Sequence, residues 1–423
     1  MMYRTILLCL IFVLSSGVKA QKQALTLDEC LTAAMKNHPL SAQNEIYAQS
    51  SELQRKNLDT GKLPQLNLNG QATYQNDVIE LPFKIPGITT PVVPKAQYKV
   101  SFDANQLIYG GGSIEAQNTI EDYSCQINQQ NNDAELYKMR ERINQLYFSV
   151  LLADLNADVI NNTIKDLGTR LEKVKASVKD GVMLPSAADV LTAEILKASQ
   201  RLLEVKSQKK ALVNTLQVLT GLTINENTAF IEPRLEVDLS VYSNLRPEFG
   251  VFALMQQKLE ASKKLTIAKD LPRVYGFGTA GYGNPGYNVF KEGSAFFYTV
   301  GAKVTWNLWN WHQTDRDKQI LDLSSRILEN QKNAYDMANK AQVQQYLADV
   351  LKADELIKSD EEIITLRKSI TLSAASQLEN GTLTATEFVT EQLAEEQALL
   401  TRNLHKMQLL QSKALYKAAT GGL

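Results

Sequence analysis

The sequence contains an internal repeat, which constrains the fold more than any other feature. The stretch from His38 to Tyr74 aligns without a gap with the stretch from Arg246 to Tyr282, a shift of 208 positions (246 minus 38). The matches keep their order: Pro39, Gln49, Glu52, Lys56, Leu63, Pro64, Gly70, Ala72 and Tyr74 recur as Pro247, Gln257, Glu260, Lys264, Leu271, Pro272, Gly278, Ala280 and Tyr282. A shift of 200 (300 minus 100) then matches Val100, Ile108-Tyr109, Gly181 and Thr220-Gly221 with Val300, Leu308-Trp309, Gly381 and Thr420-Gly421. The sequence therefore predicts two structural repeats.

Each half has the same predicted order of elements: a helix, a strand, a loop, a strand, a long helix, a turn and a second long helix. The eight-residue difference between the two shifts (208 minus 200) falls in the loop between the strands, where changes in length are tolerated. The predicted organisation is a signal peptide over 1–20; a first repeat over 21–221, with a β-hairpin over 65–109 and a helical hairpin over 113–220; a linker over 222–245; and a second repeat over 246–423, with a β-hairpin over 273–309 and a helical hairpin over 312–420.

The first twenty residues are typical of a secretory signal peptide. Arg4 precedes an apolar run from Ile6 to Leu14, and small residues lead to Ala20. A positive start, a short apolar segment and a small residue at the cleavage point define such a peptide. The run is shorter than the roughly 20 residues that a membrane-spanning helix needs. No later stretch approaches 18 consecutive apolar residues, so we expect any entry into a membrane to use strands.

Four segments are predicted to be strands, and three of them alternate regularly between one apolar and one polar face. The residues over 66–74 place Leu66, Leu68, Gly70, Ala72 and Tyr74 on one face, and the residues over 98–105 repeat the pattern. A third segment alternates over 296–308, and a fourth, over 273–283, is rich in glycine. Strict alternation means that the two faces of a strand meet different surroundings. A strand of a membrane barrel takes about 9–11 such residues, flanked by aromatic girdles. An aromatic girdle is predicted from Tyr74, Tyr109, Tyr282, Trp306, Trp309 and Trp311.

The helices are predicted to be far longer than the globular average of about 12 residues. No glycine or proline occurs over 113–167 or over 312–380. A seam of apolar residues steps by three and four along the first stretch, which is the pattern of a coiled coil. Its members are Leu136, Met139, Ile143, Leu146, Val150, Ala153, Ala157, Ile160, Ile164, Leu167, Leu171, Val174 and Val178. A looser seam is predicted in the second half, from Leu356, Ile363, Leu366 and Ile370.

Composition and motifs argue against several other classes of protein. The formal net charge of −1 lacks the basic excess of a nucleic-acid-binding protein, so no nucleic-acid partner is expected. There is no Walker-type phosphate loop, and His38, His312 and His405 have no metal-ligand spacing with the cysteines. The mature chain keeps Cys30 and Cys125, which are expected as free thiols although a disulfide remains open. We therefore predict no catalytic residues, no cofactor and no metal, and a protein that is not an enzyme.

Four strands are too few to close around a lumen. In lipid an open sheet would leave its edge backbone groups unpaired, at several kcal/mol each. The prediction is therefore a mixed α and β fold that forms a homotrimer, in which three copies contribute four strands each to a twelve-stranded barrel. The polar strand faces would line the lumen, and the long helices would continue as a coiled-coil cylinder.

These features together resemble the TolC-type outer-membrane factor family over essentially the whole mature chain. The resembling segments are Leu25-Thr26-Leu27-Asp28-Glu29-Cys30-Leu31, Asn37-His38-Pro39, Gln106-Leu107-Ile108-Tyr109-Gly110-Gly111, Asp189-Val190-Leu191-Thr192-Ala193-Glu194, Leu219-Thr220-Gly221 and Arg246-Pro247-Glu248. The resemblance implies a trimer in outer-membrane lipid with a periplasmic helical tunnel. It also implies docking of the tunnel onto a periplasmic adaptor (a membrane fusion protein), which links it to an inner-membrane pump.

The resemblance also assigns candidate residues at the periplasmic end. The adaptor-contact tips would be Val178, Gly181, Val182, Met183, Asn380, Gly381, Thr382 and Leu383. Candidates for a periplasmic gate are Glu387, Glu391 and Asp189. Where the family has a second acidic residue, one turn after the position of Glu387, this chain has Thr390. The turn before Asp189 is expected to be two residues longer than the turn before Glu387. Both acidic residues are expected in the first turns of their helices, where stabilising the helix start is an equal alternative to a gate.

Two functions remain to be compared. The first is a passive outer-membrane exit duct of a tripartite efflux or type I secretion system. The second is a soluble periplasmic coiled-coil scaffold or adaptor, which the paired amphipathic strand hairpins argue against.

Overall fold

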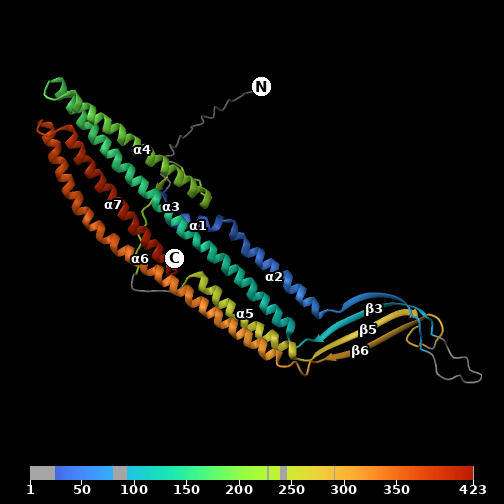
Figure 1. Ribbon diagram of the computed structural model, residues 1–423. Helices are drawn as coiled ribbons and strands as arrows, with labels where there is room; N and C mark the ends of the chain where they lie inside the picture. The colour runs from blue at the N-terminus through green and yellow to red at the C-terminus, as the bar shows by residue number, and fades with distance from the viewer. Residues whose placement is uncertain (1–23, 80–92, 226–227, 239–244, 290, 423) are drawn as a thin grey trace, which may run out of the picture. The chain divides into compact units, whose positions relative to one another are not determined.

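The computed structural model describes residues 24–79, 93–225, 228–238, 245–289 and 291–422 (Figure 1). The predicted signal peptide over 1–20, and 80–92 of the loop between the first two strands, lie outside these residues. Helices dominate the chain, and one four-stranded sheet accompanies them. None of the helices in the described part of the chain combines the length and the apolar character needed to cross a membrane.

The two halves of the chain have the same order of elements, except that two helices precede the long strands in the first half and one helix precedes them in the second. The first half contains β1 (Ala24–Leu25), α1 (Leu27–Asn37), α2 (Gln43–Asp59), β2 (Gln65–Tyr74), β3 (Ala96–Tyr109), α3 (Ser113–Lys179) and α4 (Pro185–Thr220). The second half contains β4 (Ala229–Phe230), α5 (Pro247–Asp270), β5 (Arg273–Asn284), β6 (Ala295–Thr305), α6 (Gln313–Glu379) and α7 (Ala385–Ala419). The alternating pattern therefore predicts all four long strands, except that β6 ends at Thr305, before Trp306 and Leu308.

The chain divides into two compact units, and each takes residues from both halves. The helical unit comprises residues 1–38, 138–242 and 343–423, and the strand unit comprises residues 39–137 and 243–342. Helices α3 and α6 have 67 residues each and contribute to both units.

The helical unit contains two large hydrophobic clusters of its own, and a smaller third one around Val343, Tyr416 and Ala419. One surrounds the short parallel pair β1–β4 and includes Cys30, Ile143, Phe148 and Leu216. The other lies where α3, α4, α6 and α7 approach their turns, and includes Leu167, Leu191, Leu378 and Phe388. Eight of the predicted α3 seam residues are buried: Ile143, Leu146, Val150, Ala153, Ile160, Leu167, Leu171 and Val174. The step of three and four therefore predicts the buried face of α3 correctly.

One tyrosine holds the first cluster against the β1–β4 pair. The hydroxyl of Tyr147 lies 2.7 Å from the carbonyl oxygens of both Leu25 and Ile231, and it accepts a hydrogen bond from the backbone N–H of Ile231 at 3.1 Å. The Tyr147 ring packs edge-on against Phe230. Because the side chain is buried, its hydroxyl needs these partners to offset desolvation.

The predicted α6 seam was wrong for a single copy of the chain. Leu366 is 65% exposed, and Ile363 and Ile370 are also exposed. In the part of α6 that belongs to the helical unit, the buried residues lie on another face: Val343, Val350, Ala353, Asp360, Thr371, Ala374, Ala375 and Leu378. Helix α6 therefore has two apolar stripes, of which one packs within the chain and the other does not.

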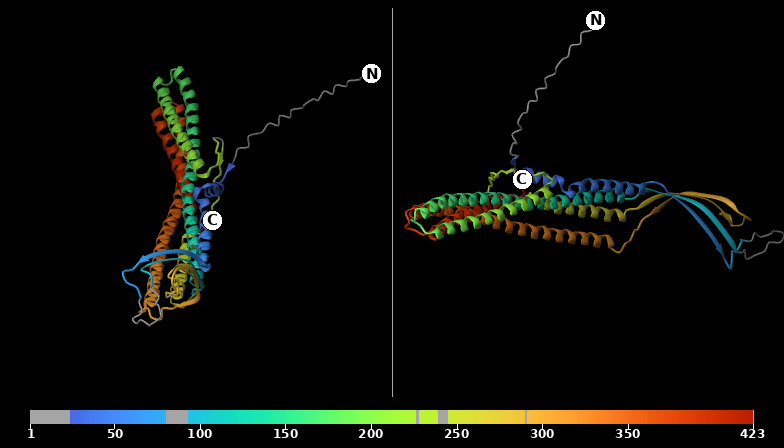
Figure 2. Two further views of the ribbon diagram at one scale, coloured as in Figure 1. Left: turned by 90° about the vertical axis from the view of Figure 1, so that its right-hand side faces the viewer. Right: turned by 90° about the horizontal axis from the view of Figure 1, so that it is seen from above.

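In the strand unit, the sheet is antiparallel throughout and has the order β2-β3-β5-β6. Its strands curve together in both views of Figure 2. Helix α5 is held at its start by Arg246, whose guanidinium donates to Glu248 at 2.6 Å and to Asn339 at 3.3 Å. The same guanidinium lies over the rings of Tyr137 and Tyr335. The Arg-Pro-Glu segment thus has a structural role at the head of α5.

Candidate functional site

The sheet has one face without any charged residue, and that face is exposed. The register aligns Leu68, Phe102, Ala280 and Tyr298 in one row across the four strands. Leu68 is 73% exposed, and Phe102 and Tyr298 are exposed as well. Other exposed side chains of this face are Leu66, Tyr74, Tyr98, Val100, Tyr282, Phe296, Val300 and Val304. An apolar surface of this extent on a folded chain marks a surface that meets lipid or another protein.

The opposite face is polar, and its side chains are crowded. Ser101 and Phe297 on this face are buried. A Cβ added at Gly301 on this face would come within 2.7 Å of the Phe277 ring, whereas a Cβ added at Gly70 on the apolar face would meet nothing within 4 Å. Side chains converge on the concave side of a curved sheet and diverge on the convex side. The polar face is therefore the concave one.

All four charged residues of the long strands lie on the polar face. They are Lys99, Asp103, Arg273 and Lys303. Asp103 accepts hydrogen bonds from Thr279 at 2.6 Å and from Ser101 at 3.1 Å, and also from the Asn69 amide. The ammonium of Lys99 lies 5.0 Å from the centroid of the Phe297 ring. Within the described residues none of the three basic side chains pairs with a carboxylate.

The six predicted girdle aromatics are all exposed, and they gather at the two ends of the sheet. Tyr74 and Tyr282 lie near the loop ends of β2 and β5. Tyr109 ends β3 next to α3, and Trp306, Trp309 and Trp311 follow β6. Trp306 donates from its indole N–H to the carbonyl of Asp270 at 3.0 Å, and the Trp309 and Trp311 rings meet edge to face.

The two helical hairpins turn with the same backbone geometry. After α3, the N–H groups of Gly181 and Val182 donate to the carbonyls of Val178 and Ser177 at 3.1 and 2.9 Å. After α6, Gly381 and Thr382 donate to Leu378 and Gln377 at the same two distances. Gly181 and Gly381 have φ of 75° and 69°, the left-handed conformation that glycine adopts most easily at a helix end.

The expected difference in turn length was therefore wrong. Each turn has five residues between its helices, 180–184 and 380–384, so the equivalent of Glu387 in the first half is Ala187. The first turn of α4 contains no acidic residue, and Asp189 lies just beyond that turn. The similarity of the Asp189 segment to the family motif concealed this two-residue offset.

The tips differ in chemistry although their backbones agree. At the first tip, Val182 is 70% exposed and Leu184 is 75% exposed. Their equivalents at the second tip are Thr382 and Thr384. Met183 and Leu383 pack against the second hydrophobic cluster, as does Val178, and so anchor the turns. Gly181, Asn380 and Gly381 are exposed.

The three gate candidates have different surroundings. Glu387 forms a capping box: its carboxylate accepts from the N–H and the hydroxyl of Thr384 at 2.9 and 2.8 Å, while its own N–H donates to the Thr384 hydroxyl at 3.2 Å. The Thr384 backbone N–H lowers the pKa of the Glu387 carboxyl. The carboxylate of Glu391 pairs with Arg367 at 3.1 Å. Asp189 is exposed, and its carboxylate has no partner within the described residues.

Two polar links of the helical unit escaped the sequence analysis. Near the turns, Glu379 of α6 pairs with Arg170 and, at 2.8 Å, with Lys173, both on α3; the Lys173 ammonium lowers the pKa of the Glu379 carboxyl. Farther along, Arg201 of α4 reaches Glu396 of α7 at 2.9 Å. Such pairs join residues about 200 positions apart, so no local pattern announces them.

Two buried carboxylates face Arg201, whose own side chain is 37% exposed. Its guanidinium also lies 3.3 Å from Glu194 of its own helix, and Glu396 is only 2% exposed. Two carboxylates thus share one guanidinium, with Lys197 at 3.5 Å from Glu194 completing the balance. A buried ion pair is costly to break because each partner is left without solvent.

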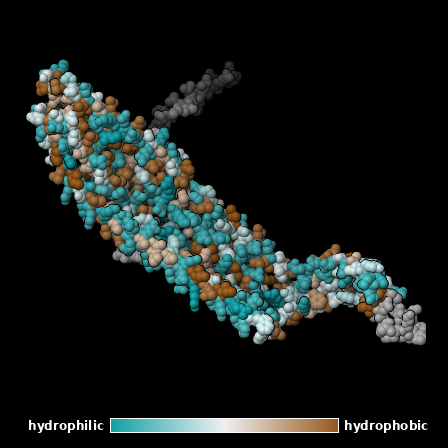
Figure 3. Space-filling model, viewed as in Figure 1, coloured by the Kyte–Doolittle hydropathy of each residue, from teal (hydrophilic) through white to brown (hydrophobic). Residues whose placement is uncertain are grey.

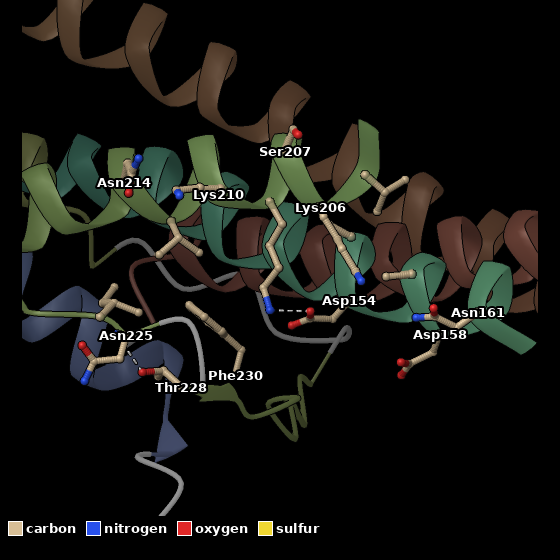
Figure 4. Close-up of a pocket in the computed structure, with 16 residues that line it drawn as sticks. Asp154, Asp158, Asn161, Lys206, Ser207, Lys210, Asn214, Asn225, Thr228 and Phe230 are labelled. Carbon is tan, nitrogen blue, oxygen red and sulfur yellow. Dashed lines mark hydrogen bonds and ion pairs between the residues drawn. The ribbon is translucent and has the colours of Figure 1, made fainter. Parts of the chain in front are cut away.

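A groove of about 710 Å³ in the helical unit is lined by α3, α4 and the residues Ile224, Asn225, Thr228 and Phe230 (Figure 4). Its wall contains an ion pair between Lys209 and Asp154 at 2.5 Å. Lys206, Lys210 and Asp158 also line it. The three lysines come from α4 and the two aspartates from α3, so the groove is lined by charges of both signs.

Hydrophobic residues are interspersed among hydrophilic ones over the surface seen in Figure 3.

The other sequence predictions about sites concern cysteines and metals. Cys30 is buried and Cys125 half-buried, and both are free thiols. Burial raises the pKa of Cys30 to about 12. Among the described residues, no group of three or more His, Cys, Asp or Glu side chains is arranged to hold a metal ion.

Comparisons with known proteins agree on the fold. No protein-family model and no curated protein sequence matches the chain. Solved structures do match. The chain is 13% identical to CusC, a protein described as forming a transmembrane channel, with 94% of this chain and 92% of CusC covered at a TM-score of 0.69. The chain is 11% identical to the outer membrane protein VceC of Vibrio cholerae, with 94% of this chain and 96% of VceC covered at a TM-score of 0.68. It is 15% identical to the MtrE outer membrane channel of Neisseria gonorrhoeae, with 94% of this chain and 89% of MtrE covered at a TM-score of 0.66.

The agreement extends over nearly the whole length on both sides of each comparison. The chain therefore has the fold of the TolC-type outer-membrane channels.

Proposed function

We propose that this chain is one subunit of a homotrimeric outer-membrane exit duct, which passively conducts substrates that a periplasmic adaptor and an inner-membrane pump deliver. It acts as a conduit and not as an enzyme. The observation that carries the proposal is the sheet: its convex face is apolar, exposed and free of charge, while every charged strand residue lies on the concave face.

The open edges of the sheet support assembly of several copies. Strands β2 and β6 each have a neighbour on one side only. Because the four strands alternate in direction, β6 of one copy meets β2 of the next in antiparallel orientation. Repeating this contact around three copies closes twelve strands, and closure satisfies backbone groups that would each cost several kcal/mol in lipid.

The helical unit also presents surfaces that a neighbouring copy would cover. Helix α4 exposes Leu196 and Leu203, which are seven residues apart and hence on one face. Helix α6 exposes its second apolar stripe, which contains Ile363 and Leu366. In a cylinder of helices each copy contacts two neighbours through different faces, so two unlike stripes are the expected arrangement.

The exposed aromatics suit the two boundaries of a membrane. Tyrosine and tryptophan favour the level of the lipid headgroups, where an apolar ring and a polar edge are both accommodated. We therefore assign Tyr74 and Tyr282 to one interface, and Tyr109 with the three tryptophans to the other. Strands of 10 to 14 residues between these belts are long enough for a tilted barrel strand.

In the helical unit, we assign the two turns between the long helices to adaptor docking, and the acidic residues near these turns to the gate. The apolar tip with Val182 and Leu184 is the stronger docking surface, because burying these exposed side chains is favourable. Asp189, whose carboxylate is exposed and without a partner in the described residues, is the strongest gate candidate. Glu391 is paired with Arg367, and the capping box of Glu387 gives that residue a second role at the start of α7.

The test combines extraction, mass and conductance. The expected result is a protein that fractionates with the outer membrane, requires detergent, has the mass of three chains and opens channels in planar bilayers. A deletion strain should become sensitive to detergents or dyes. A water-soluble monomer that never conducts would refute the duct and favour the scaffold or adaptor instead.

A further inference from the structure

The charges on the concave face of the sheet are unbalanced. Three of its four charged strand residues are basic, and the one acidic residue leaves a net of two positive charges per chain. By contrast, β2 contributes no charge at all to either face. The imbalance therefore comes from Lys99 in β3, Arg273 in β5 and Lys303 in β6.

The basic residues lie at both ends of the sheet and the acidic one lies between. The register pairs Lys99 with Gly283 near the loop end, Asp103 with Thr279 in the middle, and Tyr275 with Lys303 near the helical end. Arg273 pairs with Thr305 one step beyond Lys303. At about 3.3 Å per residue, Asp103 lies roughly 13 Å along the strands from each basic level. That separation exceeds the Debye length of about 10 Å at 0.1 M salt but not the length of about 30 Å at 0.01 M, where Asp103 offsets one of the three positive charges and a net of two remains.

Asp103 is also engaged with neutral donors. Its carboxylate is held by Thr279, Ser101 and Asn69, and none of these hydrogen bonds involves a basic group. Lys99 rests against the Phe297 ring, which orients its ammonium without neutralising it. The positive charges of the concave face therefore remain available to a permeating ion.

We propose that the barrel section of the duct is an anion-attracting passage, lined by one ring of Lys99 side chains and a second ring of Arg273 and Lys303 side chains. This inference rests on the proposed function, because three copies must close for the concave faces to surround a lumen. Rings of arginine and lysine are the device by which pores favour anions. The permeants that it favours are small anions and acidic stretches of larger cargo.

The lumen of such a barrel is wide, so the preference depends on salt. The field of each ring reaches about 30 Å at 0.01 M salt and about 3 Å at 1 M. We therefore expect the ratio of chloride to potassium permeability to exceed one in dilute salt and to approach one in 1 M salt.

The experiment measures the reversal potential of the purified trimer in planar bilayers under a KCl gradient. Four proteins are compared: the unaltered chain; a neutral triple variant with Lys99→Gln, Arg273→Gln and Lys303→Gln; a charge-preserving triple variant with Lys99→Arg, Arg273→Lys and Lys303→Arg; and Asp103→Asn. The neutral variant should lower the permeability ratio by about twofold in dilute salt. The charge-preserving variant should leave it unchanged, and Asp103→Asn should raise it.

The outcomes distinguish a failure of the anion passage from a failure of the proposed duct. If the unaltered trimer conducts but the neutral and charge-preserving variants give the same reversal potential, the anion passage is refuted and the duct stands. If no preparation conducts, the proposed function itself fails. Trimer mass and single-channel conductance of each variant show whether a variant has lost selectivity or has lost its fold.

Discussion

Replacing Leu68 with lysine tests whether the apolar face of the sheet meets lipid. Leu68 lies in β2, in the row with Phe102 and Tyr298, and it is 73% exposed in one chain. A lysine at the lipid-facing midplane of a barrel costs about 2–4 kcal/mol, falling towards zero near the interfaces. Since three copies carry the change, the trimer would lose roughly 6–12 kcal/mol by the same measure.

A sheet face that stays in water predicts a much smaller loss of stability for Leu68→Lys. If this face stays in water, Leu68→Lys changes an exposed residue and shifts stability by no more than about 0.5 kcal/mol. The adjacent residue supplies a matched control. Asn67 is exposed on the opposite face, paired across the strands with Asp103, so Asn67→Lys adds the same charge where we place the aqueous lumen.

The assay is urea unfolding of the trimer in lipid vesicles, with trimer recovery from membranes as a second measurement. We expect Leu68→Lys to reduce both severely and Asn67→Lys to leave both near the unaltered protein. Equal behaviour of the two variants would refute the assignment of the faces.

Four further results follow from the helical unit. Thr384→Ala should cost about 1 kcal/mol and speed amide exchange at the start of α7; unchanged exchange would contradict the cap. Because the folded pKa of Glu387 is depressed, its contribution is present above the unfolded pKa and is lost as pH falls through the folded one, so exchange there should quicken in acid, and Thr384→Ala should remove that dependence. Arg201→Met should destabilise the protein to urea by about 3–5 kcal/mol, since it leaves Glu396 buried without a partner; a neutral effect would mean that the cluster relaxes into water. With burial raising its pKa to about 12, the thiol of Cys30 should resist a maleimide at pH 8 in the native protein, and mass spectrometry showing rapid labelling would contradict that burial.

Much of the fold could be predicted from the sequence because the chain repeats simple periods. Alternation at period two predicts β2, β3 and β6 to within a few residues, and the step of three and four predicts the buried face of α3. These signals are local: each depends only on which neighbours along the chain share a face.

The features that the sequence did not predict have a common physical cause: each depends on contacts between residues that are distant in the sequence or on hydrogen bonds that form only in the fold. Helix α6 has two apolar stripes, and periodicity alone does not tell which one packs inside a single copy; Leu366 was assigned to the wrong one. The equivalence of Glu387 with Ala187 depends on turn hydrogen bonds, which the resemblance around Asp189 obscured. The pair of Arg170 with Glu379 joins residues 209 positions apart, beyond any local pattern.

The uncovered convex face also bears on the life of the protein before it is assembled. The helical unit has hydrophobic clusters of its own, which a single chain already buries. The sheet has no such interior. On the proposed function, a single copy therefore exposes the apolar face of its sheet to water between secretion and assembly. Encounters between copies become rarer as the protein becomes scarcer, and this hazardous interval lengthens. We therefore expect the yield of finished trimer to fall more steeply than the amount of chain synthesised, and to depend on any escort that shields the sheet in transit.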